Sequence, residues 1–227
     1  MRILILNPNT TAAMTEKLVD VARAVAAPGT ELIGVQPSWG VSAVQGYADG
    51  FVSAAASLDR VRALRAEGLE WDATVYAGFG DHGREGLAEV LRGPVVPIAE
   101  AAAMAACLIG HRYAVVTTTT RSVPQIRDIL TVAGLADRCA GIHATGLPVL
   151  AAPEELLAAF EVQAARAIEA GANVLCLGSG AMAGWAQTAS ERVGVPVVDG
   201  LTAAVTFAEG LVRVGLGQAS SPARTSA

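Results

Sequence analysis

A histidine beside an acid is the first feature of this sequence that could do chemistry. Asp81 and His82 stand in the stretch YAGFGDHG (76–83), where an apolar run breaks into glycines. The imidazole of histidine exchanges protons near neutral pH, so His82 is the leading candidate for a general acid or base, with Asp81 next to it. The alternative stays open: His82 is a solvated turn residue and Asp81 caps the following helix.

A serine in a glycine turn is the second candidate. Ser179 lies in LGSGAMAG (177–184), between an apolar run and a helical stretch, so its hydroxyl could stand at the rim of a site. The pattern is not the GxSxG nucleophile elbow, because Ala181 occupies the place of the second glycine. Without an adjacent base Ser179 is a weak nucleophile, and a role as turn residue or helix cap is equally supported.

Polar residues also follow two other apolar runs. NPNTT (7–11) places two amides and two hydroxyls before a helix, and TTTTR (117–121) places four hydroxyls in a row. Such groups can hold a carboxylate or the amide edge of a small ring. The alternatives are ordinary N-capping by Asn9 or Thr10 and the preference of threonine for strands. The residues at the four run ends that we predict to contact a substrate are Asn9, Thr10, Gly78, Phe79, Thr117, Thr118 and Gly180.

Charge and cysteine usage exclude several classes of function. With a formal net charge of −5, the chain is not expected to bind nucleic acid or an anionic membrane. The first apolar run is too short for a signal peptide, and no run is long enough to span a membrane, so a cytoplasmic protein is expected. Three cysteines without CxxC spacing predict neither disulfides nor structural zinc, and we expect Cys107 and Cys176 to be buried. No metal-site spacing and no cofactor motif is found, so neither a metal nor a cofactor is predicted.

The order of apolar runs predicts an α/β fold. Short β-rich runs alternate with Ala-rich helical stretches, which is typical of βαβ units around a parallel sheet. The runs are almost continuously apolar, as expected for strands covered by helices on both faces. His143 is expected in a connecting segment. The seven predicted strands lie at 2–7, 31–36, 73–79, 94–98, 112–118, 173–179 and 195–199.

A weak internal repeat divides the chain into two similar halves. RILILNPNTT resembles RYAVVTTTTR, VYAGFG resembles VLCLGSG, and GPVVPIAEAAA resembles GVPVVDGLTAA, in the same order. We therefore predict two pseudo-symmetric α/β lobes, each a parallel sheet flanked by helices, with a ligand cleft between them. The first lobe would comprise residues 1–98 plus 200–216, the second lobe 99–199, and the frayed tail 217–227.

In these motifs the sequence resembles the aspartate/glutamate racemase superfamily, and in particular its hydantoin and allantoin racemase branch. The resemblance runs from about residue 2 to about residue 210 and includes NPNTT, GFGDHG, PVVPIAEAAAMAA, RYAVVTTTTR, LGSGAMAG and VPVVDGLTAAV in order. It implies two pseudo-symmetric lobes, cofactor-free chemistry at a carbon next to a carbonyl, a small-molecule substrate and a homo-oligomer. Asn9, Thr117 and Thr118 match positions that hold the substrate in this family.

The sequence departs from the family at the chemistry itself. The resemblance implies two cysteines, one from each lobe, of which one removes a proton while the other delivers a proton from the opposite side. Here Gly78 and Ser179 occupy these two positions. Glycine transfers no proton, and an alcohol is too basic to act unaided as a base near neutral pH. We therefore expect the two-thiol mechanism to be excluded.

Three interpretations follow. The first is an enzyme with altered chemistry, in which His82, Asp81 and Ser179 carry proton transfer or hydrogen bonding in an isomerisation, decarboxylation, lyase or hydrolytic step. The second is a racemase in which His82 and another group replace the thiols. The third is a catalytically silent binding or regulatory relative, or a chain whose cysteines have been replaced. An enzyme is favoured, because the polar strand ends are retained, with a small cyclic amide or amino-acid-like substrate.

Overall fold

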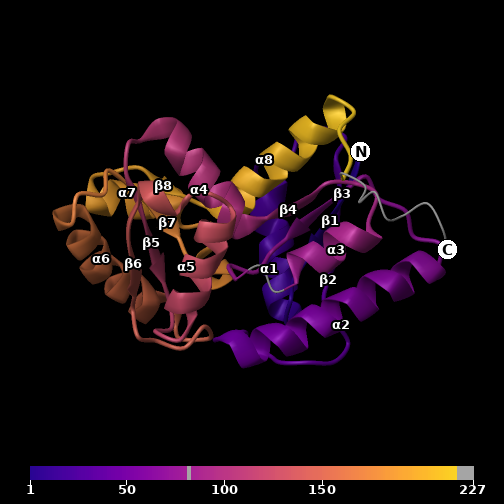
Figure 1. Ribbon diagram of the computed structural model, residues 1–227, viewed down its shortest axis with the longest axis horizontal. Coiled ribbons are helices and arrows are strands. Elements are labelled where there is room, and N and C mark those ends of the chain that lie inside the picture. Colours follow the sequence, from indigo (N-terminus) through magenta and orange to yellow (C-terminus); the bar gives the residue numbers. More distant parts are fainter. Residues whose placement is uncertain (81–82, 219–227) are drawn as a thin grey trace.

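The chain folds into two parallel four-stranded sheets flanked by helices (Figure 1). The structure is a computed structural model, and it describes residues 1–80 and 83–218. The first sheet has the order β2-β1-β3-β4. Its strands are β1 (Arg2–Leu6), β2 (Glu31–Val35), β3 (Ala73–Tyr76) and β4 (Val95–Pro97).

The second sheet repeats the first. Its order is β6-β5-β7-β8, so each strand takes the place of the strand four earlier in the chain. Every pairing in both sheets is parallel. The predicted α/β fold with two pseudo-symmetric sheets is therefore confirmed. The strands are β5 (Tyr113–Thr117), β6 (Cys139–Ala144), β7 (Val174–Leu177) and β8 (Val197–Val198).

Helices connect and cover the strands. The α-helices are α1 (Ala12–Arg23), α2 (Tyr47–Ala66), α3 (Arg84–Val90), α4 (Ile98–Ile109), α5 (Ser122–Val132), α6 (Pro153–Glu169), α7 (Ala186–Val193) and α8 (Gly200–Arg213). The described residues also form two short 3-10 helices, η1 (Ala136–Arg138) and η2 (Gly180–Met182). No helix in the described part of the chain is both long and apolar enough to cross a membrane.

All seven predicted strands are found, but the prediction missed β6. This strand has the sequence CAGIHA and lies at the edge of the second sheet, with every residue only half-buried. Glycine and alanine are weak strand formers, and an edge strand lacks the continuous apolar run of a buried strand. The expectation that His143 lies in a connecting segment was therefore wrong, because His143 belongs to β6.

The helices α4 and α8 join the two sheets. They pack against each other, α8 also contacts β3 and β4, and α4 contacts β7 (Figure 1). One apolar cluster includes Ile5 and Val75 of the first sheet and Val115 of the second, together with the alanines of both helices. Small side chains allow close approach: a Cβ added to Gly200 would lie 2.2 Å from the Ile98 carbonyl oxygen. The two sheets thus share one core.

The division into lobes at residues 98/99 and 199/200 stays a prediction. At the C-terminal end, Gln218 N–H donates to the Arg92 carbonyl at 3.0 Å, and the Gln218 side-chain oxygen accepts from Val95 N–H at 3.3 Å. The start of the predicted tail is therefore tied to the first sheet. Residues 219–227 lie outside the described residues.

Candidate functional site

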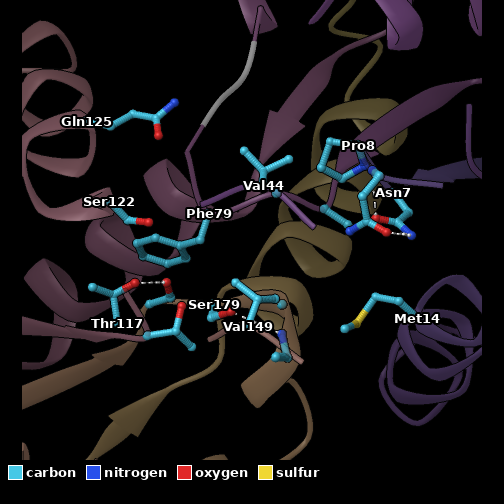
Figure 2. Close-up of a pocket in the computed structure, with 17 residues that line it drawn as sticks. Asn7, Pro8, Met14, Val44, Phe79, Thr117, Ser122, Gln125, Val149 and Ser179 are labelled. Carbon is cyan, nitrogen blue, oxygen red and sulfur yellow. Dashed lines mark hydrogen bonds between the residues drawn. The ribbon is translucent and has the colours of Figure 1, made fainter. Parts of the chain in front are cut away.

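A small polar pocket lies where the loops after β1, β3, β5 and β7 meet. In parallel sheets the carboxyl ends of the strands share one edge, and ligands of open α/β folds bind there. The pocket has a volume of about 50 Å³. Figure 2 shows Ser122 and Gln125 at one end of it and Asn7, Pro8 and Met14 at the other.

Asn7 organises the loop after β1. Its side chain is fully buried, and its amide nitrogen donates to Asn9 Oδ1 at 3.2 Å and to Thr15 Oγ1 at 3.0 Å. Its Oδ1 accepts from Asn9 N–H at 3.2 Å. Asn9 Oδ1 also accepts from Thr11 N–H at 3.0 Å. These bonds fix the two amides, and both Asn7 and Asn9 line the pocket.

Thr10 behaves differently from the other predicted contact residues, because it is not among the described residues that line the pocket. Its backbone N–H and its hydroxyl both donate to the Val41 carbonyl, at 3.0 and 3.3 Å. The N-cap position of α1 is Thr11, and that side chain makes no cap hydrogen bond. Thr10 therefore holds the loop that follows β2.

The second sheet contributes hydroxyl groups. Thr117, Thr118 and Ser179 are buried and line the pocket. Thr117 Oγ1 donates to the Gly178 carbonyl at 2.8 Å, a bond that ties the end of β5 to the loop after β7. Ser179 Oγ accepts from Ala181 N–H at 3.3 Å, so it caps η2 and faces the pocket at once.

The loop after β3 completes the opposite side. Gly78 and Phe79 line the pocket, as does Gly180 from the loop after β7. A Cβ added to Gly180 would lie 3.3 Å from the Ala77 carbonyl oxygen, so the two loops approach closely there. Asp81 and His82, the predicted proton-transfer pair, lie outside the described residues, and their roles stay predictions.

The sequence did not predict seven residues that line the pocket: Pro8, Met14, Val44, Ala77, Ser122, Gln125 and Val149. Ser122 and Gln125 stand three residues apart in the first turn of α5, which puts them on one face of that helix. This three-residue spacing directly after the threonine run could have predicted that both side chains face the pocket. Val44 and Val149 come from irregular loops, where no periodic pattern marks an inward-facing residue.

None of the three cysteines lines the pocket. Cys176 is fully buried, as predicted, and burial raises the pKa of its thiol well above the ordinary value. Cys107 is only partly buried and lies in a groove between α4 and α8, so the expectation that it is buried was wrong. Within residues 1–80 and 83–218, no group of three His, Cys, Asp or Glu side chains could hold a metal ion.

Comparisons of the sequence and of the structure with known proteins agree on one family. The Asp/Glu/Hydantoin racemase family profile matches residues 3–208. The chain is 38% identical to a hydantoin racemase of Rhizobium meliloti over 232 residues, covering 100% of this chain and 94% of that protein. Among solved structures, the chain is similar to allantoin racemase from Pseudomonas fluorescens, with 46% identity, a TM-score of 0.94 and coverage of 100% and 99% of the two chains. It is also similar to allantoin racemase from Klebsiella pneumoniae, with 39% identity, a TM-score of 0.91 and coverage of 96% and 90%.

Proposed function

Because the chain belongs to the Asp/Glu/hydantoin racemase family, we propose that it is a cofactor-independent, racemase-like enzyme. Its substrate would be a small cyclic amide or amino-acid-like molecule, with hydantoins and allantoin as the first compounds to test. The reaction would occur at the carbon next to a carbonyl. The chemistry would use no cysteine.

One observation carries this proposal. Gly78 and Ser179 line the same small pocket, at the positions where the family resemblance implies two thiols, and no cysteine of the chain reaches it. Around them the pocket retains the side-chain amide of Asn9 and the hydroxyl of Thr118. These groups can donate to the carbonyl oxygen of a cyclic amide and accept from its N–H groups, which suits the developing enolate of a proton-abstraction step.

The proposed catalytic residues are His82, Ser179 and Asp81. His82 would remove or return the proton, and Asp81 would orient the imidazole or stabilise its positive charge. Ser179 would donate a hydrogen bond to the negative charge that develops on the substrate. The proposed substrate contacts are made by Asn9, Gly78, Phe79, Thr117, Thr118 and Gly180, with Thr10 supporting the loop that carries Asn9.

A lyase, decarboxylase or hydrolase is the second candidate, and Gly78 is the observation that favours it. Glycine offers no proton donor on its side of the pocket, whereas inversion needs a group on each side of the carbon. A reaction that breaks a bond and reprotonates from one side would need only the Ser179 side. The same pocket could also bind its ligand without turnover.

Proton exchange separates these functions. Enantiopure 5-substituted hydantoins and allantoin, incubated with the protein in D₂O, are followed by NMR and by optical rotation. A racemase-like enzyme exchanges the proton at the substituted carbon for deuterium, with loss of optical rotation faster than in buffer. New products without exchange would assign a lyase or hydrolase, and saturable binding without turnover would reject an enzyme acting on these compounds.

We also propose that the chain forms a homo-oligomer through α4 and α8. α4 turns apolar side chains to solvent, with Met104 43%, Leu108 79% and Ile109 60% exposed. Beside them a groove of about 710 Å³ runs between the two helices and is also lined by Phe207 and Leu211. A ridge and a groove on one face allow two copies to interlock about a two-fold axis, and exposed apolar patches of this kind mark contact surfaces.

The charges of this face support a second copy as the occupant. Arg84 and Glu100 both line the groove and lie 3.7 Å apart. Arg84 Nε is buried without a hydrogen-bond partner among the described residues. In a two-fold contact the face meets itself, so Arg84 of one copy can approach Glu100 of the other.

Leu108→Glu tests the contact. A carboxylate buried in an apolar interface should weaken self-association at least about 100-fold, measured by light scattering over a dilution series. Val132→Glu is the matched control, since Val132 is 82% exposed on α5 and does not line the groove. A wild-type monomer at high concentration, or equal effects of the two variants, would reject this interface.

A further inference from the structure

A second cavity adjoins the candidate pocket. It has a volume of about 250 Å³, against about 50 Å³ for the pocket itself. Met14, Val149 and Ala181 line both, so the two spaces adjoin at these three residues. Figure 2 shows Met14 at the end of the pocket opposite Ser122 and Gln125.

The walls of this cavity are hydrocarbon with a single cation. Leu150, Leu156 and Trp185 supply the apolar surface, and Leu150 is 55% exposed at its edge. The cation is Lys17 of α1, the only lysine in the chain. Its Nζ lies 5.3 Å from the centroid of the Trp185 ring and 2.5 Å from the Ala181 carbonyl oxygen, to which it donates.

The charge of Lys17 is incompletely balanced. The side chain is half-buried, and no carboxylate of the described residues lies within 4.0 Å of its Nζ. Burial lowers the pKa of Lys17, and the more distant Asp199 opposes this shift. The Asp199 carboxylate is itself bonded to Gly184 N–H at 2.6 Å and Leu201 N–H at 2.9 Å. Placing a cation here without a close anion is costly unless a ligand supplies one.

We propose that the second cavity receives the substituent of a substrate whose ring occupies the candidate pocket, and that Lys17 selects substituents ending in a carboxylate. The apolar walls suit a short hydrocarbon stem, and an ammonium has three N–H donors, of which Ala181 takes one. The substrate class is therefore a cyclic amide with an acidic side chain at the carbon next to the carbonyl. This inference rests on the proposed function for the identity of the ring.

The test compares two hydantoins of equal size. One carries a 2-carboxyethyl group at C5 and the other the isosteric, neutral 2-carbamoylethyl group. Both are titrated by calorimetry against wild type, Lys17→Met and Lys17→Arg at neutral pH. The wild-type protein should bind the acid at least about tenfold more tightly than the amide, because hydrogen bonds to charged groups exceed those between neutral groups. Lys17→Met should abolish this preference, and Lys17→Arg should retain part of it.

The ratio of the two affinities distinguishes a Lys17 that selects the carboxylate from a Lys17 that only stabilises the fold. If Lys17 only stabilised η2 through Ala181, its loss would weaken both ligands equally and the ratio would not change. An unchanged ratio in Lys17→Met, or equal binding of acid and amide by wild type, would overturn the proposal. Lys17-dependent binding of the acid without turnover would instead support this cavity while rejecting the proposed catalysis.

A second measurement uses the single lysine. Reductive ¹³C-methylation labels Lys17 and the N-terminal amine only, so Lys17 gives one assignable side-chain NMR signal whose growth reports the rate of labelling. The acid, added before the reagent, should slow the labelling of Lys17, whereas the carbamoyl analogue at equal occupancy should slow it only weakly. Equal labelling rates with the two ligands would count against contact between the carboxylate and the ammonium.

Discussion

Ser179→Ala is expected to lower turnover about 100- to 1,000-fold while the protein stays folded. Removing one hydrogen-bond donor that stabilises developing charge in a pre-organised site has an effect of this size. Ser179 is 8% exposed and lines the pocket, and its Oγ accepts only a 3.3 Å bond from Ala181 N–H among the described contacts. The hydroxyl hydrogen can therefore point toward a ligand. The measurement is kcat/KM for exchange or product formation, whichever reaction the protein catalyses.

Ser190→Ala provides the matched control. Ser190 Oγ also accepts from a backbone N–H, that of Val197 at 2.9 Å, and it donates to the Ala186 carbonyl at 2.7 Å, but it lies on α7 and does not line the pocket. Its loss should reduce stability by about 1 kcal/mol and leave kcat/KM almost unchanged. Full activity of Ser179→Ala would show that Ser179 is a helix cap only, which is the structural role that its sequence context left open.

The strand ends of the site were predictable because the fold repeats. Two apolar runs lead into polar residues, one before Asn9 and the other at Thr117. These runs form β1 and β5, the corresponding central strands of the two sheets. Parallel strands expose their carboxyl ends at one edge, so the positions of Gly78 and Ser179 followed from β3 and β7. Both residues line the pocket.

Other parts of the site depend on contacts that no local pattern records. Thr10 carries a hydroxyl at the right point of the sequence, yet the loop after β2 supplies the Val41 carbonyl and draws that hydroxyl away from the pocket. Val149 reaches the pocket from the segment between β6 and α6, and β6 itself was missed because it is a half-buried edge strand. Loop conformations are set by such tertiary contacts rather than by composition.

The double variant Gly78→Cys, Ser179→Cys should gain a two-sided racemase reaction. The family resemblance implies one thiol at each position, and both residues line one pocket of about 50 Å³. An ordinary cysteine has a pKa near 8.5, so a useful fraction is thiolate near neutral pH, unlike an alcohol. With a base on one side and an acid on the other, racemisation of a 5-substituted hydantoin should rise about 100-fold or more over wild type, since each positioned acid or base contributes at least that much.

The single variants make this prediction specific. Gly78→Cys places a thiol opposite the Ser179 hydroxyl, and Ser179→Cys places a thiol opposite a glycine, so each is expected to supply proton transfer from one side only. In D₂O each single variant should exchange the substrate proton with more retention than inversion, whereas in the double variant deuterium should enter at first mainly with inversion. The gain in the double variant should also exceed the sum of the two single gains, because inversion requires both groups at once. A folded double variant that racemises no faster than wild type would mean that Gly78 and Ser179 do not face opposite sides of the substrate carbon, and the assignment of this pocket as a racemase-derived site would fail.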